Sequence, residues 1–188
     1  MNLLIEALNR PKEAFARRNN PLSWVFVALT ILMVAVFDPM ISCLAQTTPR
    51  LPPGIPIMLL HTAEGVVTYL VVCTAFWLIC KAFKSTATLG MFIRSWGISY
   101  IPTMLCAVVV SLAETYFYVF WNNSIWGLLL NIVFVGILAW KTILYVLFLR
   151  TIAGLSGKRL VGAFFACTPV ILLLAWANAI IGLKTPIL

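Results

Sequence analysis

Residues 57–80 read IMLLHTAEGVVTYLVVCTAFWLIC, an apolar run that is followed almost at once by Lys81 and Lys84. At about 1.5 Å per residue, a helix of this length crosses the roughly 30 Å hydrocarbon core of a bilayer. Hydrocarbon offers no water to an unpaired backbone amide, so a run that crosses it must be helical. This stretch therefore predicts an α-helical integral membrane protein.

The chain on either side of residues 57–80 repeats the same pattern. It is 63% hydrophobic and 10% charged, whereas soluble domains carry roughly 25% charged residues. We therefore predict an all-α fold in a single membrane domain over residues 1–188, with five transmembrane helices. Their expected ranges are 22–43, 57–80, 97–120, 125–149 and 160–183.

The basic residues predict how these helices are oriented. The formal net charge is +8, and the cations gather before the first span, after the second and after the fourth. The opposite side holds only Arg50 and Lys184. Loops rich in Lys and Arg stay in the cytoplasm, so we expect a cytoplasmic amino terminus and an outside carboxyl terminus. The three clusters are Arg10, Lys12, Arg17 and Arg18; Lys81, Lys84 and Arg94; and Arg150, Lys158 and Arg159.

Residues 1–20 predict a short amphipathic helical segment at the membrane interface. Apolar residues recur at helical spacing over residues 3–8, Pro11 can open a further helix, and Ala14 and Phe15 continue the apolar face. The basic side chains can reach anionic headgroups or dock a cytoplasmic partner, and both alternatives stay open. The candidate cytoplasmic contact surface consists of Arg10, Arg17, Arg18, Arg150, Lys158 and Arg159.

Five ionisable residues fall inside the expected spans, where such groups are costly and mark candidate functional sites. We expect Asp38, Glu64 and Glu114 to share one layer in the outer half, with His61 on the same helix face as Glu64. Lys141 is expected about 12 Å from the inner surface, snorkelling toward it, and about 10 Å too far from Glu64 to pair with it.

Two interpretations of this candidate intramembrane polar site remain open. In the first, each acid is protonated or hydrogen-bonded to neighbours such as Asn131, Tyr116 or Ser111 and stiffens the bundle. In the second, the acids and His61 line a cavity that binds a cation or relays protons. A metal site is not expected, because the chain has one histidine and lacks HExxH or paired-cysteine spacing. No cofactor, enzymatic activity or nucleic-acid partner is expected either.

Three stretches carry a family resemblance. They are residues 10–15 (RPKEAF), residues 86–92 (TATLGMF) with residues 97–102 (GISYIP), and residues 149–159 (LRTIAGLSGKR). In their order and spacing they resemble the Yip family of small multi-spanning membrane proteins that interact with Ypt/Rab GTPases, and especially its prokaryotic members. The resemblance covers nearly the whole chain and marks Tyr100, Pro102 and Gly154 as structural motif residues.

The resemblance implies a five-span helical bundle to which no established reaction is attached. This chain lacks the long amino-terminal region and the Asp-Leu-Tyr-Gly-Pro run of the eukaryotic relatives, so a Rab-type GTPase is not an expected partner. We expect a bacterial inner-membrane adaptor or scaffold in trafficking or envelope biogenesis. Its expected partners are the lipid bilayer and other membrane proteins or itself. The alternative is a small transporter or an ion- or proton-conducting subunit.

Overall fold

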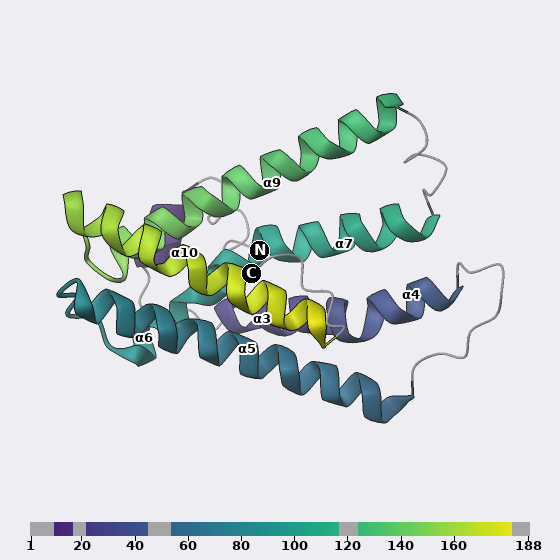
Figure 1. Cartoon of the computed structure of the whole chain (residues 1–188), viewed down its shortest axis with the longest axis horizontal. Coiled ribbons are helices and arrows are strands. Elements are labelled where there is room, and N and C mark those ends of the chain that lie inside the picture. Colours follow the sequence, from purple (N-terminus) through teal and green to yellow (C-terminus); the bar gives the residue numbers. More distant parts are fainter. Residues whose placement is uncertain (1–9, 17–21, 45–53, 117–123, 182–188) are drawn as a thin grey trace.

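The computed structural model describes residues 10–16, 22–44, 54–116 and 124–181 (Figure 1). These residues form helices and connections, with no strand among them. Within them, five helical segments are long and apolar enough to cross a membrane, which confirms the expected fold class. They are Ser23–Ile41, Ile55–Ala82, Leu89–Ser111, Ile125–Thr151 and Gly157–Ile180.

The first segment is continuous but locally widened. Helix α3 (Leu22–Leu32) passes through a π-helical turn at Met33–Phe37 into α4 (Asp38–Leu44). The amide of Asp38 donates to the carbonyl of Met33, five residues back. Pro39, the next residue, has no amide hydrogen to continue an α-helical ladder, and a wider turn accommodates this gap. The sequence predicts the helix but not this irregularity.

The third segment begins earlier than expected. Helix α6 (Leu89–Ser95) leads through a 3₁₀ turn at Trp96–Ser99 into α7 (Tyr100–Tyr116), whereas we expected the span to start at residue 97. Pro102 lies in the first turn of α7, where backbone amides have no partner within the helix, so the missing amide hydrogen of proline costs little. For the same reason Pro102 cannot donate a hydrogen bond to the 3₁₀ turn before it. The proline therefore suits a restart of the helix at this point.

The remaining long helices are α5 (Ile55–Ala82), α9 (Ser124–Thr151) and α10 (Gly157–Ile180), and the short α2 covers Pro11–Ala16. The α5–α6 and α9–α10 connections lie at the same end of the bundle (Figure 1). We call this the basic end, because Lys81, Lys84, Arg94, Arg150, Lys158 and Arg159 lie in or beside these two connections. We call the opposite end the far end.

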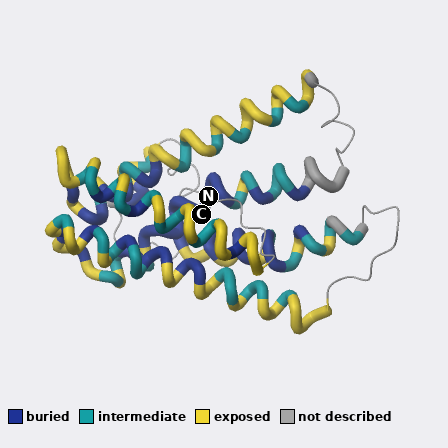
Figure 2. The backbone as a smooth tube through the Cα atoms, in the orientation of Figure 1, coloured by how far each residue is buried: buried dark blue, intermediate teal, exposed yellow. Residues whose placement is uncertain are grey.

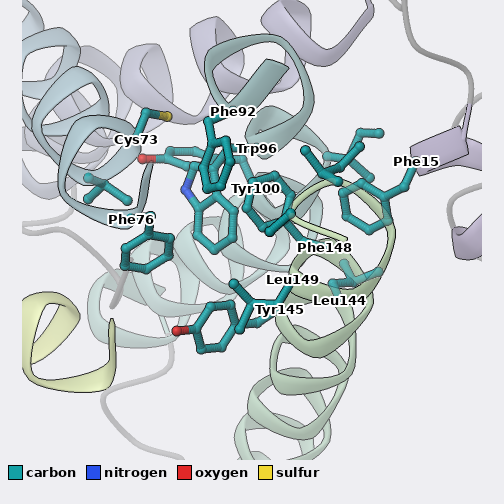
Figure 3. Packing of buried hydrophobic residues seen from close by; sticks show 14 of the residues in the cluster. Phe15, Cys73, Phe76, Phe92, Trp96, Tyr100, Leu144, Tyr145, Phe148 and Leu149 are labelled. Carbon is teal, nitrogen blue, oxygen red and sulfur yellow. The ribbon is translucent and has the colours of Figure 1, made fainter. Parts of the chain in front are cut away.

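An aromatic cluster fills the core toward the basic end (Figure 3). The ring of Trp96 lies edge-on to Phe76 at 4.9 Å and to Phe148 at 4.8 Å between centroids. Phe148 also meets Phe92 at 5.0 Å and Phe15 of α2 at 6.0 Å. Each such pair contributes about 0.5–1.5 kcal/mol beyond simple burial. Phe15 is 1% exposed, so α2 is fixed to the protein core.

Two glycines bring helices into close contact. A Cβ at Gly97 would meet the backbone and hydroxyl of Ser23 on α3, and a Cβ at Gly65 would lie 3.0 Å from the Ile31 side chain. Helices in lipid have no hydrophobic driving force to associate, so their association depends on close van der Waals packing, which small residues allow. These contacts also set the relative depths of α3, α5 and α7.

Helix α10 is displaced toward the basic end. Asn178, near its last turn, accepts a hydrogen bond of 3.1 Å from Thr68, which lies near the middle of α5. Figure 1 shows α10 beginning beside α9 and crossing toward α5, where it ends well short of the far end. The outer parts of α5 and α9 are therefore left uncovered by α10, and Figure 2 shows them as largely exposed.

Candidate functional site

The three stretches that carry the family resemblance meet at the basic end. The hydroxyl of Ser85, after α5, donates 2.7 Å to the carbonyl of Ala153, after α9, and accepts a 3.3 Å bond from the amide of Ala87. The indole of Trp77 donates 3.1 Å to the carbonyl of Ala87. Phe15 of the first stretch packs on Phe148. The loops and α2 thus form one connected unit.

The three motif residues have structural reasons for their identity. Gly154 has a φ of +67°, a left-handed conformation that costs other L-residues roughly 1–2 kcal/mol. Tyr100 is 5% exposed, and its ring lies edge-on to that of Tyr69 at 5.4 Å. Pro102 is fully buried where α7 restarts. They shape the unit at the basic end, and its cations form its outer surface.

The exposed cations of the basic end form the candidate contact surface. Arg10 pairs at 3.5 Å with Glu13, and both side chains are more than half exposed. Arg150, Lys158 and Arg159 are also exposed, whereas Arg17 and Arg18 lie outside the described residues. Four further exposed cations lie at the basic end but outside the candidate contact surface: Lys12, Lys81, Lys84 and Arg94.

Within the helices, the described contacts of the ionisable residues fall at several positions. His61 Nδ1 and Glu64 Oε2 lie 2.9 Å apart across one turn of α5, and both side chains are about one-fifth to one-quarter exposed. Asp38 is 7% exposed and accepts a 2.6 Å hydrogen bond from the Ser111 hydroxyl of α7. Glu114 lies in α7, but its side chain is outside the described residues.

The contacts between helices place these clusters at two depths. Gly65 packs on Ile31, which precedes Asp38 by seven positions, and Glu64 lies one position outward of Gly65, so Glu64 lies about 9 Å deeper than Asp38 at 1.5 Å per residue. The expected layer placed Asp38 and Glu64 at one depth with Glu114, whose side chain is outside the described residues. The reason for the difference in depth is the relative sliding of α3 and α5, which the span ends do not specify.

Lys141 does not extend toward the inner surface as expected. Its ammonium donates to the Thr103 hydroxyl and lies 5.8 Å from the centre of the Tyr100 ring. Side chains lean toward the amino-terminal end of their helix, and in α9 this is the far end. Thr103 precedes Ser111 by eight residues, or about 12 Å, so the Lys141–Thr103 pair and Glu64 lie at similar depth.

Ser111 was among the neighbours expected to hydrogen-bond an acid, and it donates to Asp38. Thr103, which accepts from Lys141, and the Thr68–Asn178 pair were missed by the sequence reasoning. All four residues are buried, and the signal that would find them is a hydroxyl or amide on the same helix face as packed apolar residues. Beside Lys141, a cavity of about 170 Å³ lies between α9 and α10 over Trp96. Among the described residues, no group of three potential metal ligands occurs.

A helical bundle with five membrane-crossing segments, buried polar pairs and one strongly basic end defines an integral membrane protein. The family model of the Yip1 domain matches residues 5–179, a range that includes four of these segments in full and all but the last residue of the fifth. The chain belongs to the Yip family, which confirms the resemblance seen in its three stretches. No match was found among curated proteins or among solved structures.

Proposed function

We propose that the protein is a non-enzymatic adaptor of the bacterial inner membrane, with its basic end in the cytoplasm. The adaptor acts in membrane trafficking or envelope biogenesis by binding a partner at the basic end. The partner is a membrane protein with an acidic cytoplasmic segment, because the exposed side chains of this surface are predominantly cationic. A Rab-type GTPase is not required by any feature of this surface.

The observation that carries the proposal is the unequal packing of the bundle. Bulky aromatic rings and the Ser85 hydrogen bonds hold α2 and both loops at the basic end in fixed positions. The outer half of α9, by contrast, has no buried residue between Ile125 and Ile143. A rigid scaffold beneath exposed cations is the arrangement expected of a recognition surface, because it limits the entropy lost on binding.

The test is a triple substitution, Arg150→Gln with Lys158→Gln and Arg159→Gln, in the full chain in native membranes. In-cell crosslinking followed by purification should show a partner band with the unchanged chain and at least a tenfold weaker band with the triple variant. A matched control, Lys12→Gln with Lys81→Gln and Lys84→Gln, removes the same charge from the same end. Loss of the band in both variants alike would indicate general electrostatics and reject a specific surface.

Because these cations also orient the chain, topology must be checked in each variant. A reporter fused to the carboxyl terminus should remain on the outside in both, as in the unchanged chain. An unchanged partner band in a correctly inserted triple variant would reject the proposed adaptor surface.

The second candidate is a small transporter or ion-conducting subunit. The observation that favours it is the His61–Glu64 pair, an ionisable pair partly exposed at a depth where charge is costly. Purified protein in liposomes should then show proton or cation flux that Glu64→Gln abolishes and the exposed-loop control Lys84→Gln leaves intact. Flux no greater than that of protein-free liposomes excludes this candidate.

A further inference from the structure

Helix α9 has an uncovered outer half that carries one conspicuous polar side chain. From Ile125 to Ile143 every residue is exposed or half-exposed, and Leu144 is the first buried one. Asn131 lies in this apolar run with its side chain exposed. Among the described residues, none hydrogen-bonds to its carboxamide. An amide that faces hydrocarbon without partners costs several kcal/mol, so this position needs an occupant that can hydrogen-bond.

The position of Asn131 on α9 explains why no other helix among the described residues covers it. Asn131 precedes Leu138 by seven residues, or two turns, and so lies on the same helix face. Leu138, Thr142 and Tyr145 on that face border the cavity shared with α10. Further out, α10 has crossed toward α5 and pairs with Thr68 instead (Figure 1). The face used for packing near the basic end thus continues outward past Asn131 beyond the reach of α10.

We infer that this face binds the same face of a second copy of the chain, forming a symmetric dimer in which the two Asn131 side chains hydrogen-bond to each other. A carboxamide has both donors and an acceptor and is therefore complementary to itself. Two copies inserted in the same orientation place Asn131 at the same depth, as a two-fold axis along the membrane normal requires. Gly127, one turn away, leaves room for the helices to approach.

This dimer is independent of the adaptor surface, because it uses the outer half of α9 and not the basic end. A phospholipid chain is the competing occupant of this face. It fills apolar space but cannot satisfy the carboxamide, whereas Asn131 of a second copy satisfies it.

The test measures dimerisation of the full chain in liposomes as the lipid-to-protein ratio is raised. Subunits are counted by single-molecule photobleaching. Asn131→Leu should weaken dimerisation about 3- to 30-fold, the range for interhelical polar contacts in membranes, and Asn131→Gln should retain most of it. Because Asn131 has no partner among the described residues of its own chain, neither change should alter folding. A chain that is monomeric at every dilution, or an Asn131→Leu variant that dimerises normally, overturns the inference.

Disulfide crosslinking gives an independent readout of the face involved. Val135, one turn from Asn131, and Val133, on the opposite side of α9, are 66% and 45% exposed. Val135→Cys should yield a covalent dimer on mild oxidation, above the background from the native cysteines, and Val133→Cys should not. Equal crosslinking of the two variants, or none with Val135→Cys, contradicts the proposed interface.

Discussion

The contact between Gly97 and Ser23 makes the sharpest stability prediction. Gly97→Ala adds a single methyl group, which would meet the Ser23 carbonyl carbon at 2.9 Å and would come closer still to two oxygen atoms of Ser23. Carbon atoms pack at about 3.5–4.0 Å, so α3 must move away by roughly 1 Å. Part of the obstacle is backbone, and no side-chain rotation relieves it.

The expected cost follows from how tightly this region is packed. Overpacking a well-packed core typically costs about 1–3 kcal/mol. We expect the upper half of that range, because Trp96 and Ile98, on either side of Gly97, are each only 2% exposed and cannot shift independently. The free energy of unfolding of the purified protein, measured by SDS titration in mixed micelles, should fall by about 2–3 kcal/mol.

Gly136→Ala is the matched control, since a Cβ there meets nothing within 4 Å. It should leave stability unchanged or raise it by up to about 1 kcal/mol through better helix propensity. Equal stability of the Gly97→Ala variant and the unchanged chain would refute the close contact between α3 and the 3₁₀ turn that precedes α7. Equal losses in both variants would show that alanine acts in some way other than through Ser23.

Three further predictions concern single contacts. Gly154→Ala should lower the free energy of unfolding by about 1–2 kcal/mol, because φ is +67° there. Gly90→Ala, with open space around its Cβ, should not lower it, and equal losses of stability in the two denaturation curves would contradict this. Thr68→Val and Asn178→Leu should show a coupling of about 0.6–1.7 kcal/mol in a double-mutant cycle, and additive effects would mean that their hydrogen bond contributes nothing. Thr103→Val should lower the free energy of unfolding by about 1–3 kcal/mol, because it removes the hydroxyl that accepts from the Lys141 ammonium, whereas Thr103→Ser, which keeps the hydroxyl, should lose less; equal losses in the two variants argue against this account.

The class of protein could be predicted because the solvent imposes it. Hydrocarbon permits few backbone solutions, so an apolar run such as residues 57–80 specifies a helix without knowledge of its neighbours. The ends of the spans were less certain. Leu89–Ser95 was missed as the start of the third segment because Arg94 interrupts its apolar character, although the residue ends up exposed at the basic end.

The candidate site could be predicted only as a set of unusual residues. Which partner each residue meets depends on the rotation and sliding of one helix against another, and hydropathy records neither. Phe15 illustrates the difficulty, because an apolar side chain beside a membrane can face lipid or protein with little difference in hydropathy. Its burial against Phe148 and the contact of Lys141 with Thr103 both follow from three-dimensional packing alone.

The displacement of α10 has a consequence for the lipids around the protein. Of the described helices, α5 and α9 spread apart toward the far end, and α10 accompanies them only toward the basic end (Figure 1). The two leaflets therefore meet different protein surfaces. Annular lipids near the basic end contact α10, whereas those near the far end contact the sides of α5 and α9 that α10 leaves uncovered.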